Sequence, residues 1–206
     1  LLQRQPGTKT LTLHRLVQTV LKEGMKKHAQ MLWAKRMIRV VDHAFTDVEF
    51  PAWPYCQTCL PQAETCAALI KQWSLDLEEA PRLLNQAGYY LWERAQHADA
   101  EWFYKQALET RERVLRPGHI YVALSLNNLA ALYRAQGMYE QAEQLYKRTL
   151  AISEQILGPE HPDVATYLNN LGMLYYLQGK QEQAESLYLR GGRGPARCGL
   201  TAGAFP

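Results

Sequence analysis

The strongest constraint on the fold is a stretch of sequence that recurs at an offset of 42 residues. Residues 119–148 align with residues 161–190, and 18 of these 30 aligned positions are identical, which chance does not supply. The same step backwards finds a weaker copy within residues 85–115. A period of this length indicates a stack of similar units, each of which buries its apolar face against its neighbours.

Each unit has the apolar spacing of two amphipathic helices. In the second unit, residues 122–133 and residues 142–152 carry apolar side chains at steps of three and four. Gly137 lies between the two runs and can take the left-handed conformation that ends a helix. Pro159 follows the second run and cannot continue it. The sequence therefore predicts an all-α chain built from helix pairs.

Small residues are expected to bring the two helices of a unit together. Ala130 or Gly172 on the first helix and Ala142 or Ala184 on the second leave room for a large partner. The side chains predicted to fill this room are Tyr133, Tyr146, Tyr175 and Tyr188.

The pattern resembles the tetratricopeptide repeat. Its signature of Leu, a small residue, Tyr, Gly, Ala and an aromatic residue is met at Leu129, Ala130, Tyr133, Gly137, Ala142 and Tyr146. The 42-residue period and the Leu-Gly-Pro-Glu-His-Pro linker are similar to the kinesin-light-chain type of this repeat. The resemblance implies an α-α superhelix, a tetratricopeptide solenoid, over residues 83–190. Its expected units are residues 83–118, residues 119–160 and a truncated unit at residues 161–190.

This resemblance implies a concave wall, lined by the first helix of each unit, that binds a protein or peptide segment. The candidate peptide-binding residues are Asn85, Asn127, Asn128, Arg134, Asn169, Asn170 and Tyr176. An Asn amide offers both a donor and an acceptor to a peptide backbone. A second interpretation stays open, in which these amides bond one another across helices and hold the spacing of the units. Ala135 and Leu177 stand where carboxylate-clamp members of the family have a Lys, so specificity for a terminal carboxylate is not expected.

Formal charge divides the chain into a basic head and an acidic body. Residues 1–40 hold nine Lys and Arg but one acidic residue, whereas residues 41–189 hold eleven Lys and Arg against nineteen Asp and Glu. Two regions with different roles are therefore expected.

The basic head resembles part of a second family. Residues 8–13 alternate as a short strand would, and residues 14–28 place apolar side chains at helical intervals. The string Leu-His-Arg-Leu-Val-Gln from Leu13 is similar to the segment that closes the winged-helix module of NB-ARC signalling ATPases, where a Met-His-Asp motif occurs. The resemblance implies that His14 senses nucleotide in an intact parent protein. Arg15 replaces the Asp of the motif.

The expected organisation follows from both resemblances. Residues 1–50 form the end of a winged-helix-like module and a connector helix, and residues 51–82 form a helical connector to the repeats. The chain lacks a GxxxxGK[ST] phosphate loop. It should not hydrolyse a nucleotide by itself, and an ATPase domain of the parent protein would lie upstream of Leu1.

A DNA-binding head is the alternative interpretation. Basic residues recur along two predicted helices and could contact phosphates: Lys22, Lys26, Lys27, Lys35, Arg36 and Arg39. A solvated face, or neutralisation by the acidic repeats, explains the same residues more simply. The runner-up function is therefore a transcription regulator with a basic winged-helix head and a repeat sensor.

No catalytic or metal-binding pattern emerges from the sequence. The CxxC of Cys56 and Cys59 has Cys66 nearby but no fourth ligand at zinc spacing, so packed thiols are expected. The six His show no metal spacing. His119 and His161 are repeat equivalents that should start helices. We expect no enzyme activity, no catalytic or metal site and no cofactor.

The chain ends in a Gly- and Pro-rich tail at residues 191–206, which should be disordered or aberrant because it cannot complete the second helix of the third unit. The exposed end of that unit offers a surface for self-association. No run of 18 apolar residues and no secretory signal occurs, so a cytoplasmic location without a membrane is expected. The predicted function is a protein-interaction scaffold or sensor region of a larger NB-ARC-type signalling protein.

Overall fold

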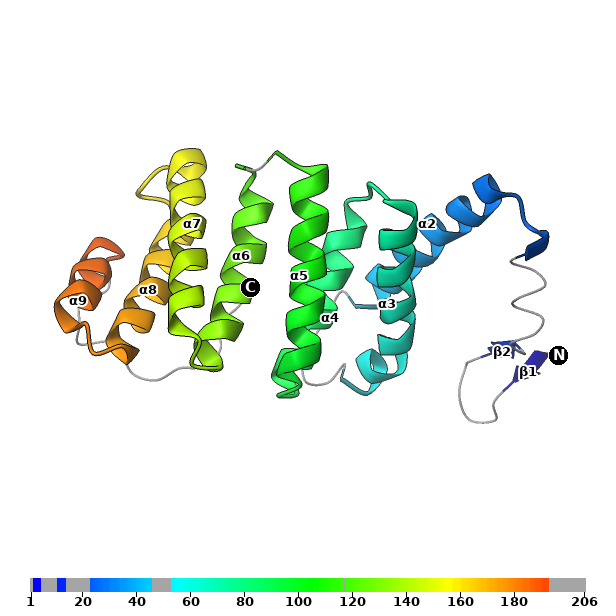
Figure 1. The fold of residues 1–206 in the computed structure, drawn as a ribbon, viewed down its shortest axis with the longest axis horizontal. Coiled ribbons are helices and arrows are strands. Elements are labelled where there is room, and N and C mark those ends of the chain that lie inside the picture. Colours follow the sequence, from blue (N-terminus) through cyan, green and yellow to red (C-terminus); the bar gives the residue numbers. More distant parts are fainter. Residues whose placement is uncertain (1, 5–10, 14–22, 46–52, 117, 193–206) are drawn as a thin grey trace.

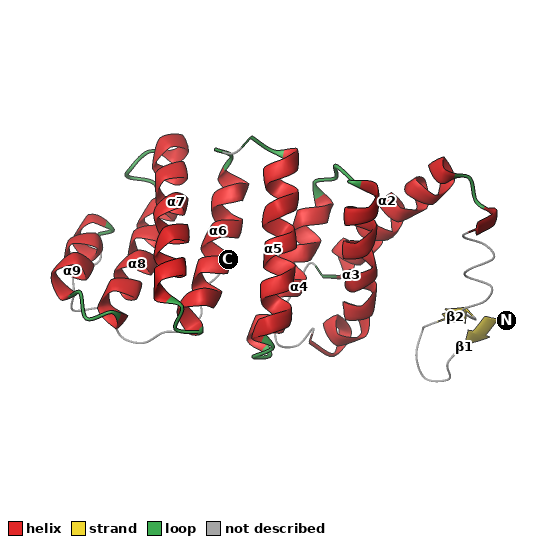
Figure 2. Cartoon of the chain, in the orientation of Figure 1, coloured by secondary structure: helices red, strands yellow, loops and turns green. Residues whose placement is uncertain are grey.

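The computed structural model describes residues 2–4, 11–13, 23–45, 53–116 and 118–192. These residues form eight helices and one short pair of strands (Figures 1 and 2). The predicted all-helical solenoid is confirmed. The elements are β1 (Leu2–Arg4), β2 (Leu11–Leu13), α2 (Lys27–Ala44), α3 (Trp53–Trp73), α4 (Glu79–Glu93), α5 (His97–Val114), α6 (Ile120–Ala135), α7 (Tyr139–Leu157), α8 (Pro162–Leu177) and α9 (Gln181–Arg190).

The helices follow one another along the long axis of the molecule, as Figure 1 shows. α4 with α5, α6 with α7, and α8 with α9 form three helix pairs, and each pair packs on the next. α2 and α3 pack together and cover α4 at the N-terminal end of the row. The first unit begins at Glu79, so the boundary proposed at residue 83 falls inside α4.

The turn inside each unit has the left-handed residue that the sequence predicts. Gly137 and Gly179 both have φ of 75°, and Ala95 occupies the equivalent place with φ of 57°. The backbone N–H of Met138 donates to the carbonyl of Tyr133 at 2.9 Å and closes the turn. Ala95 of the first unit is therefore strained, whereas Gly takes the same conformation in the other two units without this strain.

The linkers between units also end and start helices as expected. α7 ends at Leu157, and Gly158 follows with φ of 85°. His161 caps α8, because its Nδ1 accepts a hydrogen bond from the backbone N–H of Asp163 at 3.1 Å. His119 caps α6 in the same way through the N–H of Tyr121 at 3.2 Å.

Close helix contact within a unit depends on one small residue opposite a buried Tyr. A Cβ atom added to Gly172 would lie 2.8 Å from the ring of Tyr188. One added to Gly88 would lie 2.8 Å from the ring of Tyr104, so the first unit repeats the arrangement. Tyr146 fills the equivalent place in the second unit and is fully buried.

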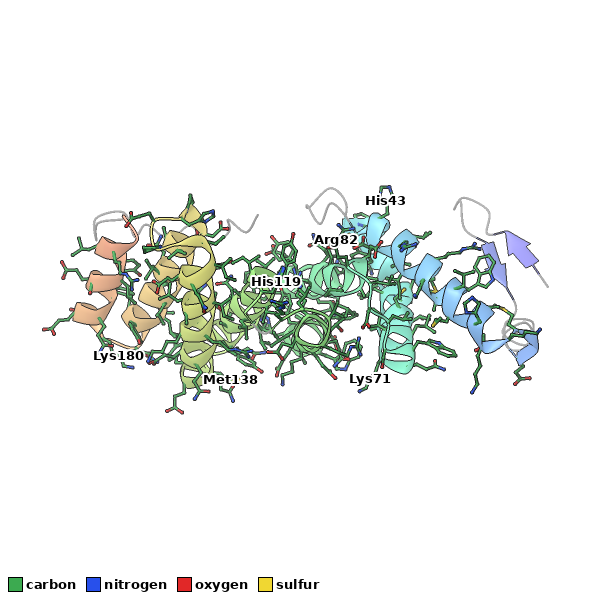
Figure 3. All side chains as sticks on the ribbon, turned by 90° about the horizontal axis from the view of Figure 1, so that it is seen from above. His43, Lys71, Arg82, His119, Met138 and Lys180 are labelled. Carbon is green, nitrogen blue, oxygen red and sulfur yellow. The ribbon has the colours of Figure 1, made fainter. Side chains whose placement is uncertain are left out.

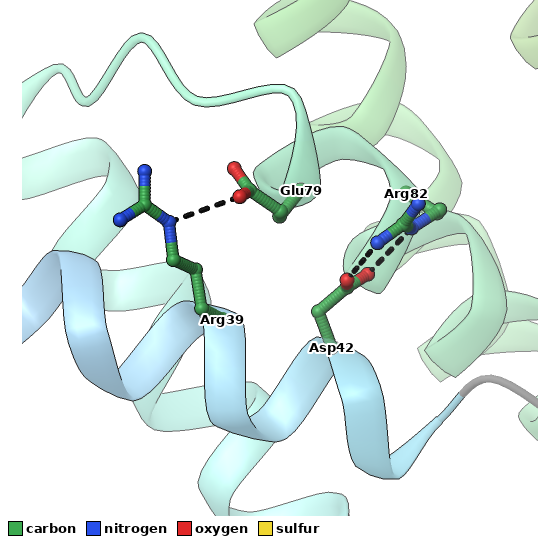
Figure 4. A network of polar contacts seen from close by, with 4 residues as sticks. All are labelled: Arg39, Asp42, Glu79 and Arg82. Carbon is green, nitrogen blue, oxygen red and sulfur yellow. Dashed lines mark hydrogen bonds and ion pairs between the residues drawn. The ribbon is translucent and has the colours of Figure 1, made fainter.

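Two ion pairs join α2 to α4 (Figure 4). Arg39 Nε donates to Glu79 Oε1 at 2.9 Å. Arg82 Nε donates to Oδ1 of Asp42 at 2.9 Å, and its Nη2 bonds the other oxygen of this buried carboxylate. α2 is therefore held to the first unit by charge pairs, and one of them uses Arg39, a basic residue that the DNA-binding alternative requires.

Several expectations fall on residues outside the described part of the chain. These include His14, most of the expected helix at residues 14–28, and residues 193–206 of the tail. Of the expected strand at residues 8–13, Leu11–Leu13 is described and pairs antiparallel with Leu2–Arg4. No helix in the described ranges is long and apolar enough to cross a bilayer.

Candidate functional site

The candidate site lies on the first helix of each unit, α4, α6 and α8. Equivalent positions on these helices form rows that run across the units, because the 42-residue period repeats. One row consists of Trp92, Arg134 and Tyr176, and another consists of Gln86, Asn128 and Asn170. We call the side chains in these rows the first-helix face.

Four Asn side chains form a hydrogen-bonded amide ladder across α4, α6 and α8. Asn128 Nδ2 donates to Asn85 Oδ1 at 2.8 Å, and Asn170 Nδ2 donates to Asn127 Oδ1 at 2.9 Å. Asn127 Nδ2 contacts Asn128 Oδ1 at 3.5 Å and links the two pairs. The ladder therefore joins consecutive units, as the second interpretation of these Asn residues expected.

Burial divides the ladder into supporting and accessible members. Asn127 is 3% exposed and uses both its carbonyl and its amide within the ladder. Asn85, Asn128 and Asn170 are half-buried. An Asn amide has two donors and two acceptor lone pairs, and Asn170 uses one donor of these. The accessible members thus keep unused hydrogen-bonding capacity.

Two of the predicted site residues flank the ladder with side chains that suit a ligand. Tyr176 is 58% exposed on α8, and Arg134 is half-buried at the equivalent place on α6. Trp92 is half-buried in the same row on α4, where its ring centroid lies 5.9 Å from that of Tyr89. An aromatic, a cation and a second aromatic therefore follow one another along the row.

Asn169 differs from the other predicted site residues. Its Oδ1 is buried and has no hydrogen-bond partner among the described residues. The backbone of Gly191 lies beside it, since a Cβ added there would be 3.1 Å from this oxygen. A buried carbonyl oxygen without a partner is costly.

A second set of contacts joins the units and was not found from the sequence. Tyr133 donates to Glu101 Oε1, and Tyr175 donates to Glu143 Oε1, both at 3.1 Å. We call these two bonds the Tyr–Glu ties. The sequence predicts only a packing role for Tyr133 and Tyr175, although both members of each tie recur at an offset of 42 residues.

Charge concentrates at Glu143, the acceptor of the second tie. Lys147 Nζ lies 2.7 Å from Oε1, and Lys180 Nζ lies 3.3 Å from Oε2. Hydrogen bonds from Lys147, then from Tyr175 and Lys180, lower the pKa of Glu143 to about 2. Lys180 lies beside the turn that starts α9, at the same edge of the helix row as its equivalent Met138 (Figure 3).

Arg111 is a buried cation near the N-terminal end of α6. Its Nη1 donates to the carbonyl of Tyr121 at 2.9 Å and to Ser125 Oγ at 2.7 Å. Burial lowers the pKa of Arg111 to about 10. Ser153 and Tyr167 stand at the equivalents of Arg111 and Ser125. Where the first two units meet, the large side chain therefore belongs to the earlier unit, whereas it belongs to the later unit where the second and third units meet.

The thiols of α3 show no ligand set. Cys56 and Cys66 are buried and Cys59 is half-buried, and burial raises the pKa of Cys66 to about 12. Within the described ranges no group of three His, Cys, Asp or Glu side chains could hold a metal ion.

Comparison with known proteins places this geometry among helical repeats. The sequence profile of the family described as Tetratricopeptide repeat matches residues 79–155 and, in a second overlapping match, residues 121–191. No curated protein matches the chain.

Three solved structures share the fold at low sequence identity. BtubC (BKLC) from P. vanneervenii is 19% identical with a TM-score of 0.54, over 77% of this chain and 72% of that one. A putative kinesin light chain from Podosopora anserina with nearly identical TPR-like repeats is 18% identical with a TM-score of 0.58, over 85% and 81%. A Rap protein complexed with Competence and Sporulation Factor is 17% identical with a TM-score of 0.58, over 82% of this chain and 44% of that protein.

Proposed function

Because the chain belongs to the tetratricopeptide repeat family, we propose that it is an interaction scaffold that captures an extended protein segment along α4, α6 and α8. The observation that carries the proposal is the amide ladder, which crosses all three first helices. Its half-buried members Asn85, Asn128 and Asn170 come from the three helices in turn. An extended backbone can pair with such amides independently of its own side chains.

The site residues have different proposed roles. Asn128 and Asn170 contact the backbone of the captured segment, with Asn85 at the N-terminal end of the ladder. Asn127 holds the two pairs together from its buried position. Arg134 and Tyr176 select side chains of the segment, since a guanidinium pairs with acidic groups and a phenol ring covers apolar ones.

A structural relative supports capture of a partner by this architecture. The Rap protein with the same fold was crystallised in complex with Competence and Sporulation Factor. The identity of 17% carries the fold alone to this chain, so the partner segment here follows from the ladder and its flanking residues.

We place this scaffold in a larger signalling protein of the NB-ARC type, in the cytoplasm. The resemblance of residues 9–61 supports this context, in which His14 would couple the state of a nucleotide to the repeats. The pairs from Arg39 to Glu79 and from Arg82 to Asp42 connect α2 directly to the first unit and would carry such a coupling. A DNA-binding head is less favoured, because Arg39 is already engaged with Glu79.

The test separates contact with a ligand from support of the fold. Peptides are first selected on the full chain from a display library of short random sequences. Their affinity is then measured for the unaltered chain and for Arg134→Ala and Tyr176→Ala, whose side chains lie outside the ladder. We expect each change to weaken binding about tenfold, or 1.4 kcal/mol, without lowering the melting temperature. Gln144→Ala on the exposed face of α7 is the matched control. Unchanged affinity in both site variants overturns the proposed site.

A further inference from the structure

The outer side of α8 and α9 carries the same acceptors that join the units elsewhere in the chain. We call it the terminal face and define it by Asn169, Glu185 and Leu189. It stands at the C-terminal end of the described helix row (Figure 1). The two internal joints, between the first and second units and between the second and third units, show what such a face binds.

At each internal joint, one unit supplies acceptors and the following unit supplies donors. An Asn carbonyl of the earlier unit accepts from an Asn amide of the next, as in Asn85 with Asn128. A Glu of the earlier unit accepts from a Tyr hydroxyl that lies five residues after the donor Asn, as in Glu101 with Tyr133. The joint between the second and third units repeats both contacts at 2.9 Å and 3.1 Å.

The terminal face has both acceptors, and the described residues supply neither the Asn amide nor the Tyr hydroxyl that meets them at the internal joints. Asn169 Oδ1 is the equivalent of the two bonded carbonyls, and it is buried without a hydrogen-bond partner in the described part of the chain. Glu185 is the equivalent of Glu101 and Glu143 and is exposed. Leu189 replaces the Lys that bonds those two carboxylates. It is 61% exposed, so the face combines an apolar side chain with one exposed carboxylate and one buried, unpaired carbonyl.

The described chain does not extend itself across this face as the internal units do. α5 and α7 have 18 and 19 residues, whereas α9 has 10 and ends at Arg190. Gly191 caps α9, and Gly192 follows with φ of 72°, which turns the backbone away from a helical path. The helix that would lead into a fourth unit is therefore interrupted.

A second copy of the chain offers no matching donors on an open face of its described residues. The side of α4 that faces the N-terminal end is covered by α2 and α3. The Asn and Tyr donors of α6 and α8 are engaged inside their own row. Two terminal faces placed against each other would bring two Glu185 carboxylates into one interface, with Leu189 in place of the Lys that pairs with the equivalent Glu in the other units.

We propose that the terminal face binds a helical hairpin of the same repeat type from a different polypeptide. The first helix of that hairpin carries an Asn and, five residues later, a Tyr. The Asn amide donates to Asn169 Oδ1 and the Tyr hydroxyl donates to Glu185. Apolar side chains of the hairpin cover Leu189. The hairpin would continue the row as the two internal joints do, whatever ligand the first-helix face binds.

The experiment uses a synthetic polypeptide with the sequence of residues 119–157 as the probe. This segment is a hairpin with the required Asn128 and Tyr133. It is titrated into the isotope-labelled full chain and followed by NMR. We expect saturable shifts confined to α8 and α9, and at least tenfold weaker binding to Asn169→Ala and to Glu185→Gln. Glu182→Gln, an exposed carboxylate in the first turn of α9, is the matched control.

A probe with Asn128→Ala and Tyr133→Phe must bind the unaltered chain at least tenfold more weakly than the original probe does. A second measurement does not depend on whether the free probe folds. Residues 191–206 are replaced by a copy of residues 149–190, so that a further hairpin of this type is joined covalently to the terminal face. We expect a higher melting temperature, with the gain reduced by Glu185→Gln. The proposal is overturned if neither the probe binds nor the appended hairpin stabilises, or if Glu185→Gln leaves the affinity of the probe and the gain from the appended hairpin unchanged. Dimerisation of the unmodified chain through this face also overturns it.

Discussion

The hydroxyl of Tyr175 on α8 donates a 3.1 Å hydrogen bond to Oε1 of Glu143 on α7. One unit earlier Tyr133 makes the same bond to Glu101 at the same distance. Both bonds cross from one helix pair to the next. Polar ties of the repeat therefore set how adjacent units stack, in addition to the apolar core.

Glu143→Gln should lower stability at neutral pH, because the variant loses the charge that Lys147, Lys180 and Tyr175 stabilise. We expect a loss of about 1 kcal/mol for this partly exposed site. The pKa of Glu143 is lowered to about 2 from 4.5. The stabilisation is therefore complete above about pH 4.5 and is lost as the pH falls toward 2.

The measurement is urea denaturation of both proteins at several pH values. The difference in free energy of unfolding should be constant near neutrality and shrink below pH 4.5. Glu140→Gln, in the exposed first turn of the same helix, should show no comparable trend. A difference that grows with acidity would contradict the assigned role of the carboxylate.

Ala95→Gly should stabilise the chain. Ala95 has φ of 57°, in the region that costs an L-residue about 1 kcal/mol. Part of the gain is offset by the greater freedom of Gly in the unfolded chain. The reverse change, Gly137→Ala, should cost a similar amount, since Gly137 has φ of 75°. Thermal denaturation of the two variants must give shifts of opposite sign.

Gly88→Ala should destabilise the first unit by about 1–3 kcal/mol, because the added methyl would lie 2.8 Å from the buried ring of Tyr104. Gly172→Ala meets Tyr188 at the same distance. Tyr188 belongs to the short α9, which can shift more easily, so Gly172→Ala should lower stability less than Gly88→Ala. Calorimetric melting of the two variants compares them. Equal costs would argue against relaxation of the terminal helix.

Arg111→Met should be tolerated better than Arg111→Ala. The guanidinium is buried against Ser125 and Tyr121, so the charge itself is costly there. Methionine keeps most of the volume, whereas alanine leaves a cavity that costs about 2 kcal/mol or more. Chemical denaturation distinguishes the two. If both variants lose the same stability, the hydrogen bonds of Arg111 matter more than its volume.

The periodicity of the sequence predicts most of the fold. The 42-residue offset placed the turns at Gly137 and Gly179 and the helix starts at His119 and His161, and the structure confirms all four. Local rules determine these features, because a left-handed turn and a helix cap depend on a few adjacent residues. The sequence also predicts that Gly172 leaves room for a large side chain, and the structure shows that Tyr188 fills it.

The polar contacts between units were harder to predict. Asn85 and Asn128, which are hydrogen-bonded, are 43 residues apart. The repeat period of 42 residues alone does not reveal this pairing. The pair from Asp42 to Arg82 joins α2 to the first unit, and α2 has no repeat equivalent with which it could be aligned. Contacts of this kind arise from the packing of particular side chains, so the sequence pattern left both interpretations of the ladder open.

The most direct test of the account follows the Asn side-chain amides by NMR while a peptide selected on the full chain is added. Binding along the first-helix face predicts that the Nδ2 signals of Asn128 and Asn170 shift with the same saturation as backbone signals of α4, α6 and α8. Signals of α5 and α7 should change little. Saturable shifts confined to α5 and α7, or to α2, with the ladder unchanged, would contradict the proposed site.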